Sequence, residues 1–278
     1  MSFPRKWEYK IKKWIPAFAG RTIDDMINKA AVIIPARYGS TRFPGKALVS
    51  VQSKPLIQWI YEAAARSRLV NRVIVATDDM RIYKTVEGFG GEVTMTSSRP
   101  RTGSDRCAEI AEKLEEEIII NLQADELLNG SEMFDELILF MIKNQSVRMG
   151  TLKREIFYPE ELWDRNVVKV VTDNDDNALY FSRSPIPYIR GRILSEKEGL
   201  PEKTFYKHLG IYSYRRDFLL LFSALPTTKL EDLEKLEQLR VIESGYRIKV
   251  KETGYVSYRV DTPEDLLKIN ELTAKHTE

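Results

Sequence analysis

The stretch "AVIIPARYGSTRFPGK", residues 31–46, runs from a continuous apolar segment directly into a cationic loop. The apolar residues from Ala31 to Ala36 suit a strand that is buried on both faces, as strands of parallel sheets are. The loop that follows combines cations with turn-forming residues: Arg37, Arg42, Lys46, Gly39, Pro44 and Gly45. This order predicts an α/β fold with a binding loop at the end of its first core strand.

From this strand outward, the chain alternates between apolar runs and helical patterns. The pattern predicts a helix over Pro55–Arg66, a strand in "RVIVAT", a helix over Asp79–Gly88, a strand in "EVTMT", a helix over Asp105–Leu114 and a strand in "IIINL". Such alternation implies crossover connections and a largely parallel sheet that is covered by helices. Function is then expected beyond the carboxyl ends of the strands.

The composition is that of a globular protein with a sizeable core, because 43% of the 278 residues are hydrophobic. The 43 basic and 41 acidic side chains nearly cancel, which argues against nucleic acid as a partner. A single cysteine, Cys107, excludes an internal disulfide framework and fits a reducing cytoplasm. No apolar run is long enough for stable membrane insertion, so we expect a soluble protein.

Residues 1–25 differ from the rest, because "MSFPRKWEYKIKKWIPAFAGRT" is basic and aromatic. Its apolar run is too short and interrupted for a secretory signal. One interpretation is an arm that lies on a membrane surface. The other, which we favour, is a dispensable tail or a start assigned too early, since Met26 lies just before the first core strand. We predict a single domain over residues 26–278.

The cationic loop suits a phosphate group. Backbone N–H groups of a glycine-containing turn approach an anion closely, and the cations offset its charge. The loop is not a Walker A motif, because Ala47 follows Lys46 and the glycine spacing is wrong. A solvated surface loop is the alternative, and the number of cations after a buried strand favours the anion site.

Carboxylates at strand ends are candidates for a metal site. "IIINLQADE" places Gln123, Asp125 and Glu126 directly after an apolar strand. Mg²⁺ binds through one or two carboxylates together with substrate phosphate oxygens, so Asp125 is the first candidate ligand. Its alternative role is a cap for the helix that begins near Ser131, although Ser131 is itself a suitable N-cap.

The second carboxylate comes from "YRVDTPEDLLKI". Thr262, Pro263 and Asp265 match a capping box, which leaves Asp261 at the strand end without a structural role. Asp261 is therefore the second candidate metal ligand. Asp78 and Asp79 compete for this role, but capping of the helix that follows them is favoured.

Other segments allow both a structural and a functional interpretation. In "RPRTGSDR", Ser104 and Asp105 are possible helix caps and Arg106 is a possible phosphate ligand. "DNDDN" contains the D-x-D of metal-dependent glycosyltransferases, but its place between two strand-like runs favours a hairpin turn. The polar residues of "LEDLEKLEQLRVIESG" suit an ordinary solvated helix face. His208 is interpreted as structural more readily than as catalytic.

The motifs together resemble one enzyme family. They are "IIPARYGSTRFPGK", "VIVATDD", "GGEVTMTS", "TGSDR", "NLQADE", "NVVKVV", "ALYFSRSPIPY", "HLGIYSYRRDFL", "LEKLEQLRVIESGYRIKV" and "VDTPEDL". Their order and approximate spacing are similar to those of the 3-deoxy-manno-octulosonate cytidylyltransferases, or CMP-Kdo synthetases. The resemblance extends from Ala31 to the C-terminus. "YFSRSPIP" with "HLGIY" and "LEQLR" is the most specific part of the set.

This resemblance implies a Rossmann-like nucleotidyltransferase fold with a mixed sheet flanked by helices, usually in a homodimer. The implied reaction joins CTP to an acidic eight-carbon sugar, Kdo, and gives CMP-Kdo and pyrophosphate for lipopolysaccharide biosynthesis. The resemblance assigns the roles by position. It implies that Arg37, Arg42 and Lys46 bind the CTP phosphates, that Asp125 and Asp261 bind Mg²⁺, and that Gln123 and Arg106 line the nucleotide site. It also implies contacts with the sugar acid from Arg183, His208, Glu237 and Gln238. The resemblance makes Arg37, Lys46, Asp125 and Asp261 the catalytic set.

Two departures from the family pattern bear on affinity. Ala124 and Leu127 stand where glycine and proline are usual, and "RTGS", residues 101–104, varies the usual Ser-Gly-Thr. Because an alanine methyl restricts the backbone near the nucleotide, we expect altered affinity or a related sugar. The alternatives are a cytidylyltransferase for the 8-amino analogue, a metal-dependent glycosyltransferase and a non-catalytic nucleotide-binding protein.

Overall fold

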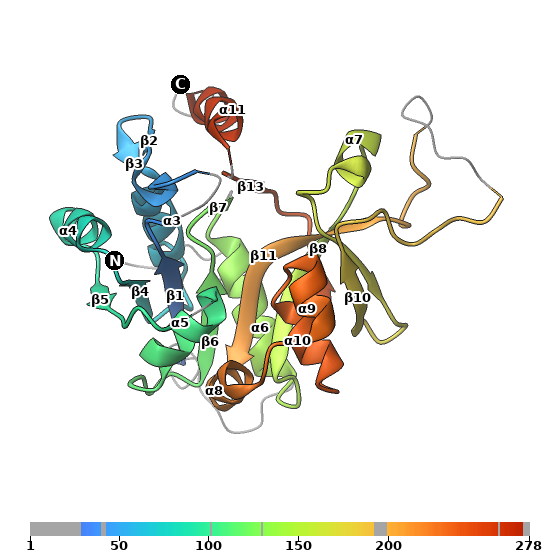
Figure 1. The fold of residues 1–278 in the computed structure, drawn as a ribbon, viewed down its shortest axis with the longest axis horizontal. Coiled ribbons are helices and arrows are strands. Elements are labelled where there is room, and N and C mark those ends of the chain that lie inside the picture. Colours follow the sequence, from blue (N-terminus) through green and yellow to red (C-terminus); the bar gives the residue numbers. More distant parts are fainter. Residues whose placement is uncertain are drawn as a thin grey trace, which may run out of the picture.

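A nine-stranded mixed sheet forms the centre of the computed structural model, which describes residues 29–39, 43–100, 102–128, 130–191, 199–260 and 262–274. The strands are Ala30–Ala36 (β1), Arg72–Thr77 (β4), Val93–Met95 (β5), Ile118–Leu122 (β6), Met149–Glu155 (β8), Lys169–Thr172 (β9), Ala178–Ser182 (β10), Tyr206–Arg215 (β11) and Lys249–Glu252 (β12). Their order is β10-β9-β11-β6-β1-β4-β5, with β8 beside β11 and β12 beside β8 (Figure 1). Two small antiparallel pairs lie outside this sheet: Ser50–Val51 (β2) with Lys54–Pro55 (β3), and Glu126–Leu128 (β7) with Ser257–Arg259 (β13).

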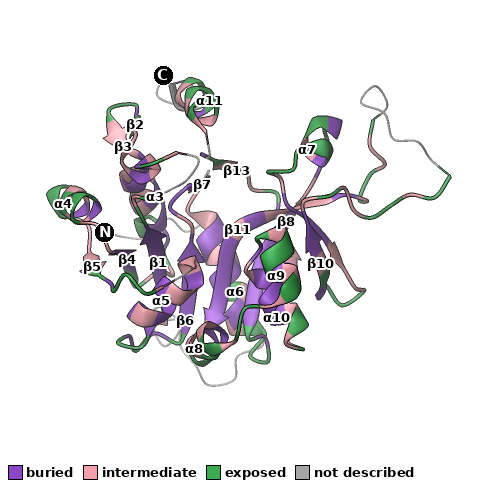
Figure 2. Ribbon diagram, viewed as in Figure 1, coloured by how far each residue is buried: buried purple, intermediate pink, exposed green. Residues whose placement is uncertain are grey.

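Helices cover both faces of the sheet (Figure 1). The helices in the described part of the chain are the 3₁₀ helix Lys46–Leu48 (η1) and the α-helices Leu56–Ala65 (α3), Met80–Gly88 (α4), Gly103–Ala111 (α5), Glu132–Lys143 (α6), Pro159–Trp163 (α7), Arg216–Ala224 (α8), Lys229–Glu234 (α9), Gln238–Glu243 (α10) and Pro263–Ala274 (α11), of which α7 and α11 lie away from the central sheet. Alternate side chains of β1 serve opposite faces, as the pleat requires. Val32 and Ile34 join the core cluster with α3 and α6, whereas Ala31 and Ile33 join the cluster with α5 and α8. The central strands β1, β4 and β6 are almost entirely buried, whereas the edge strands β5 and β12 are only partly buried (Figure 2).

The parallel half of the sheet confirms the predicted alternation. β1 pairs in parallel with β4 on one side and with β6 on the other, and β4 pairs with β5. The chain therefore crosses from one side of β1 to the other between β5 and β6. In open α/β sheets, such a switch point leaves a crevice at the carboxyl ends of the strands. Arg37 follows β1 and Gln123 follows β6 at this position.

The other half of the sheet is largely antiparallel and is organised around β11. This strand pairs with β6, β8 and β9. Ile211, in its middle, lies beside Leu122 at the carboxyl end of β6, and its first residues extend beyond that end, paired with β8 and β9. β9 and β10 form the hairpin predicted for "DNDDN". The carboxylate of Asp173 accepts hydrogen bonds from the amides of Asp175 at 2.9 Å and Asn177 at 2.7 Å, which closes the turn.

Helix caps agree with the predictions in part. Asp79 caps α4 and accepts from the amide of Arg81 at 2.9 Å, and Thr262 with Asp265 forms the capping box of α11. The prediction for α5 is wrong: the cap is Thr102, two residues before Ser104, and the helix begins at Gly103. Ser131 stands at the N-cap of α6, but its side chain makes no capping bond.

The segment "LEDLEKLEQLRVIESG" forms two short helices, α9 and α10, instead of one solvated helix. Lys235 ends α9 with a φ of 54°. The solvated-face interpretation is wrong for three of its polar residues, because Glu231, Gln238 and Arg240 are buried. The Arg240 guanidinium donates to the Glu231 carboxylate through Nε at 2.8 Å, so these buried charges compensate each other. Among the described residues, no helix has the length and apolar character to span a membrane.

Candidate active site

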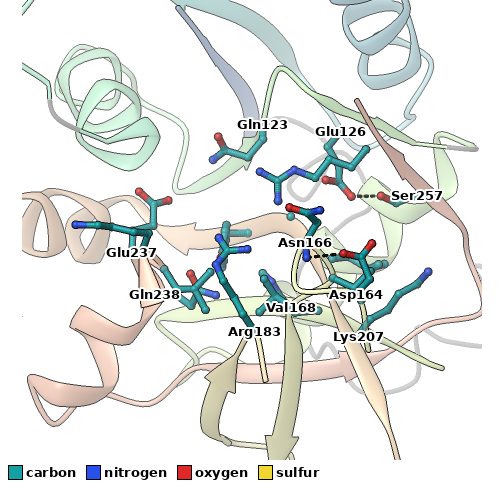
Figure 3. A pocket seen from close by; sticks show the side chains of 18 of the residues that line it. Gln123, Glu126, Asp164, Asn166, Val168, Arg183, Lys207, Glu237, Gln238 and Ser257 are labelled. Carbon is teal, nitrogen blue, oxygen red and sulfur yellow. Dashed lines mark hydrogen bonds between the residues drawn. The ribbon is translucent and has the colours of Figure 1, made fainter. Parts of the chain in front are cut away.

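A cleft of about 1130 Å³ opens where the carboxyl ends of β1 and β6 meet the beginning of β11. The parallel half contributes Arg37 and Gln123 to its walls. The other half contributes Arg183 and the start of α10 at Glu237 and Gln238. Figure 3 shows Arg183 extending between Glu237 and Gln238 on one side and the loop of Asp164 and Asn166 on the other. The cleft thus has one wall from each half of the sheet.

The cationic loop owes its shape to Gly45. This residue has a φ of 71°, and a Cβ atom there would lie 2.9 Å from the Tyr38 ring. Its amide donates to the carbonyl of Tyr38 at 2.9 Å, which closes the loop directly before Lys46. Only glycine takes this conformation without strain. Arg42, the third predicted cation of this loop, lies outside the described residues.

Lys46 and Asp125 meet next to the cleft, beside its lining residues Glu126 and Arg259. The Lys46 ammonium forms an ion pair with Asp125 Oδ2, and Arg259 Nη2 lies 3.5 Å from the same oxygen. Burial acts to raise the pKa of Asp125, but the charges of Arg259 and Lys46 outweigh it and lower the pKa. Asp125 is therefore an ionised carboxylate near neutral pH, as a metal ligand must be.

The second predicted ligand, Asp261, lies outside the described residues. Its neighbour Val260 is described, and the Val260 amide donates to the carbonyl of Asp125 at 2.9 Å. The pairing of β7 with β13 thus brings the end of "YRV" against the segment that carries Asp125. This hydrogen bond brings Asp125 and Val260 together although they are far apart in the sequence.

The donor set fits Mg²⁺ better than a transition metal. No group of three or more histidine, cysteine, aspartate or glutamate side chains is placed to hold a metal among the described residues. Mg²⁺ does not need such a group, because one or two carboxylates suffice when substrate phosphates supply the other oxygens. Asp125 provides one buried, ionised carboxylate next to the cleft, 3.5 Å from the lining residue Arg259.

A second cavity of about 110 Å³ adjoins the cleft on the side of the parallel strands. Its lining is Pro35, Ala36, Arg37, Pro100, Thr102, Gly103, Arg106 and Gln123. Arg106 is buried here and is oriented by Asp78, whose carboxylate lies 3.0 Å from Nη2, and by the hydroxyl of Thr96. The predicted nucleotide residues Arg106 and Gln123 therefore share one small cavity, and Arg37 lines both cavities.

Glu237 links the two walls of the cleft. Its carboxylate accepts from the Ser104 hydroxyl at 2.7 Å and from the Ser104 amide at 3.4 Å, at the first turn of α5. The Ser104 hydroxyl also accepts from the Asn121 side chain at 3.0 Å. Burial raises the pKa of Glu237, whereas the bonds from Ser104 and Thr102 oppose that shift. The predicted sugar residue is thus held by the helix that also borders the small cavity.

Arg183 is held by several main-chain and side-chain groups. Its Nε donates to the carbonyl of Glu234 at 2.9 Å, and its Nη1 donates to the carbonyl of Arg165 at 3.0 Å. The Glu234 carboxylate accepts from the Arg183 amide at 3.1 Å and from the Ser182 hydroxyl at 2.6 Å. These bonds fix the guanidinium at the cleft wall before any substrate arrives.

His208 lies in β11 and lines the cleft. Its Nε2 lies 2.9 Å from the Thr151 hydroxyl, and its ring packs edge-on against Phe181 with centroids 5.0 Å apart. Desolvation, and then the nearby charge of Arg259, lower its pKa to about 3. His208 is therefore neutral at physiological pH, which suits a hydrogen-bonding wall residue better than an acid catalyst.

Sequence reasoning missed the functional potential of Glu126 and Arg259. Glu126 is buried and lines the cleft, the Ser257 hydroxyl donates to it, and desolvation raises its pKa to about 7 (Figure 3). Arg259 lines the cleft beside Asp125. Their sequence signals were weak, because Glu126 directly follows the stronger candidate Asp125 and Arg259 lies two positions before the stronger candidate Asp261. Ala124 and Leu127, the departures from the family pattern, are both buried in the core cluster with α3 and α6.

Comparisons with known proteins agree on one family. A family model described as cytidylyltransferase matches residues 31–250. A relative from Geobacter sulfurreducens, named 3-deoxy-manno-octulosonate cytidylyltransferase, is 52% identical over 242 residues, which cover 86% of this chain and 97% of the relative. A relative with the same name from Thermodesulfovibrio yellowstonii is 49% identical over 243 residues, with 84% and 94% of the two chains covered.

A solved structure is similar over nearly the same region. It is that of CMP:2-keto-3-deoxy-manno-octonic acid synthetase complexed with CTP. The TM-score is 0.80 at 41% sequence identity, and the match covers 89% of this chain and 99% of that one. The mixed sheet flanked by helices is thus the fold of a nucleotidyltransferase, as the sequence motifs implied.

Proposed function

The chain belongs to the cytidylyltransferase family, and from this premise we propose that it joins CTP to 3-deoxy-manno-octulosonate, giving CMP-Kdo and pyrophosphate. The observation that carries the proposal is the two-walled cleft. One wall presents Arg37 and lies next to the Lys46–Asp125 ion pair, which suits a metal-bound triphosphate, and the other presents Arg183, which suits a sugar acid. A single cleft therefore has separate places for the two substrates.

The nucleotide lies along the parallel half. The small cavity takes the pyrimidine, where Arg106 and Gln123 offer hydrogen-bonding groups to the ring edge. The triphosphate extends into the cleft past Arg37 and Lys46, with Arg42 of the same loop as the third cation. An ammonium has three donors, so Lys46 is able to bond Asp125 and a phosphate oxygen together.

The sugar acid lies against the other wall. The planar fork of Arg183 is suited to its carboxylate, which it can bind bidentately. Glu237 and Gln238, at the start of α10, offer acceptors and a donor to the sugar hydroxyl groups. Neutral His208 supplies a further polar edge to the same wall.

The chemistry is an in-line attack of the anomeric hydroxyl on the α-phosphorus. Negative charge grows on the phosphoryl oxygens and on the leaving pyrophosphate, and Arg37 and Lys46 stabilise it. Asp125 and Asp261 would hold Mg²⁺, which when bound offsets charge and lowers the pKa of the attacking hydroxyl. Arg183 and Glu237 orient the sugar so that its hydroxyl faces the phosphorus.

The assembly and location belong to the same proposal. We place the enzyme in the cytoplasm, in keeping with its single, buried cysteine, Cys107. We assign it a homodimer, supported by exposed aromatic side chains at Tyr158, Trp163 and Tyr188. Light scattering coupled to size-exclusion chromatography tests the dimer, and a mass of one chain would contradict it.

The decisive experiment measures pyrophosphate release by the purified protein with Mg²⁺, CTP and Kdo. We expect release only when all three are present. In separate reactions, UTP replaces CTP and the 8-amino sugar replaces Kdo. Removal of Mg²⁺ with EDTA should stop the reaction and added Mg²⁺ should restore it. Pyrophosphate release with the 8-amino sugar but not with Kdo would mean that the 8-amino sugar is the substrate. No release with any sugar would overturn the proposal.

Asp125→Ala tests the metal site, with Asp175→Ala as the matched control. Asp175 belongs to the exposed hairpin turn and to the D-x-D that a glycosyltransferase would need. We expect Asp125→Ala to lower kcat by about a hundredfold or more, because one charged ligand and its fixed position are lost. Asp175→Ala should have the wild-type rate. A wild-type kcat of Asp125→Ala would show that catalysis does not need Asp125 as a metal ligand.

A further inference from the structure

Lys169 is a charged residue in the middle of the core. It opens β9, and 0% of its surface is exposed. Its ammonium donates to the carbonyls of Asp164 at 2.9 Å, Val167 at 2.7 Å and Arg183 at 2.7 Å. An ammonium has three N–H donors, so these bonds use all of them. The lysine thereby ties two separate chain segments to one point.

Both segments line the cleft, and both lie just outside the paired strands. The loop of residues 164–168 precedes β9 and contributes Asp164, Asn166 and Val168, whereas Arg183 follows the end of β10. Figure 3 shows these side chains on the same side of the cleft. The pairing of β9 with β10 ends at Lys169 and Ser182. The His208 amide holds the end of the loop through the Val168 carbonyl at 2.8 Å, and Glu234 holds the Arg183 amide at 3.1 Å. The bonds of Lys169 and Arg183 are those that connect the loop directly with residue 183.

The guanidinium of Arg183 depends on the same loop. Its Nη1 donates to the carbonyl of Arg165, which lies between the two loop carbonyls that Lys169 binds. The loop carbonyls of Asp164, Arg165 and Val167 thus all face a cation. A shift of the loop would move the acceptor that orients Arg183.

A structural role in stability does not by itself account for this arrangement. Burying an ammonium is costly, and its hydrogen-bond partners here are carbonyls. The charges of Asp164 and Glu234 offset only part of that cost, because burial still lowers the pKa of Lys169. An apolar side chain of similar volume would fill the space without that cost. Burial lowers the pKa of Lys169 to about 8, so the group still carries its charge at pH 7. Unlike an apolar side chain, the ammonium holds the carbonyls of Asp164, Val167 and Arg183 at fixed distances from one another.

We propose that Lys169 is a positioning residue for the sugar acid: it fixes the loop of residues 164–168 against Arg183, so that the guanidinium meets the substrate carboxylate. This inference rests on the proposed function, which supplies the sugar acid as ligand. It predicts a defect that is specific to one of the two substrates, because the nucleotide side of the cleft belongs to other strands.

Lys169→Met tests the proposal, with Lys153→Met as the matched control. Lys153 is also a buried lysine of the same sheet, 6% exposed, but it donates to the side chains of Thr172 at 2.9 Å and Asp176 at 3.2 Å. We expect Lys169→Met to raise the KM for the sugar acid at least tenfold and to leave the KM for CTP within twofold. Lys153→Met should leave both KM values within twofold.

Hydrogen exchange supplies a readout that does not depend on turnover. In Lys169→Met, the amides of residues 164–168 and 183–184 should exchange faster than in the wild type, whereas Lys153→Met should leave them unchanged. An unchanged sugar KM in a folded Lys169→Met protein would overturn the positioning role alone, as would an equal rise of both KM values. If the wild-type protein itself formed no CMP-sugar, the proposed function would fall and the positioning role with it.

Discussion

Single side chains next to the cleft have their places fixed by local backbone geometry. Lys46 reaches Asp125 because Gly45, with its φ of 71°, turns the loop toward the strand ends. Both residues were predictable, since each follows a buried strand and has a chemistry that suits phosphate or metal. Their contact with each other was not, because they are 79 positions apart and periodicity says nothing about such distances.

Substitution of Gly45 tests the loop at this scale. We expect Gly45→Ala to lower kcat/KM for CTP about tenfold or more, because a left-handed alanine costs roughly 1–2 kcal/mol and its Cβ would lie 2.9 Å from Tyr38. Gly39→Ala is the matched control, since among the residues that the structure describes nothing lies within 4 Å of its Cβ position. Steady-state kinetics at varied CTP decides the matter, and equal effects of the two variants would contradict this account.

The neutral state of His208 makes stability depend on pH. Its pKa is lowered to about 3 in the folded chain, while the unfolded chain titrates near 6.5. As the pH falls from 6.5 toward 3, the unfolded state takes up a proton that the folded state does not, so stability decreases. Between pH 7 and pH 5 we expect a loss of about 2 kcal/mol from this group.

Urea unfolding at the two pH values measures this loss. His208→Gln has no ionisable ring, so its free energy of unfolding should change by about 2 kcal/mol less than that of the wild type over the same interval. The difference between the two proteins cancels the contributions of all other titrating groups. Parallel pH profiles of wild type and variant would show that His208 is charged in the folded state.

At the scale of elements, the sequence was most informative where a pattern is local. Strands β1, β4 and β6 lie where continuous apolar runs predicted them, and Asp79 caps α4 as expected. The start of α5 was misplaced because Thr102, Ser104 and Asp105 are all acceptable caps, and tertiary bonds chose among them. Glu237 engages the Ser104 hydroxyl, and Thr102 caps the helix with Asp105, whose carboxylate accepts from the Thr102 amide at 3.2 Å.

This link between α5 and α10 gives a prediction for Ser104→Ala. Loss of the hydroxyl leaves the Glu237 carboxylate and the Asn121 amide each short of a partner, which costs about 1–3 kcal/mol of stability. Glu237 should also lose its fixed position, so we expect the KM for the sugar acid to rise severalfold. Thermal unfolding and kinetics with each substrate varied measure the two effects.

Ser213→Ala provides a control for Ser104→Ala. Ser213 is also fully buried in the sheet, but its hydroxyl has no hydrogen-bond partner among the described residues. Removing it should change neither stability nor KM appreciably, because no bond is lost. If the two serine variants had the same stability and the same KM for the sugar acid, the hydrogen bond from Ser104 to Glu237 would not contribute to either.

At the scale of the whole molecule, the active site is a property of topology. The parallel half follows from the alternating pattern, whereas the pairing of β11 with β6 and β8 joins residues that are about ninety and sixty positions apart. Arg183, Glu237 and Gln238 reach the cleft through that pairing, so only resemblance, and not periodicity, placed them with the nucleotide residues. The polar burial of α9 and α10 was missed for the same reason.

Ligand binding should be visible in the stability of the whole chain. CTP with Mg²⁺ at a hundred times its Kd is expected to stabilise the fold by about 2.7 kcal/mol, which corresponds to a rise in Tm of about 5–10 °C. UTP at the same concentration should give a smaller rise if the small cavity selects its base. Differential scanning fluorimetry measures both, and equal shifts would argue that the cavity does not discriminate between pyrimidines.

The division of the cleft between two halves of one sheet also has an evolutionary consequence. The residues proposed to contact the sugar acid lie on β11 and α10 and directly after β10, whereas most of those proposed for the nucleotide and the metal follow β1 and β6. Mutations on the first set of elements are therefore free to accumulate while the apparatus for activating a nucleotide is inherited intact. A lineage built on this scaffold can change the sugar it activates without having to reinvent the chemistry of activation.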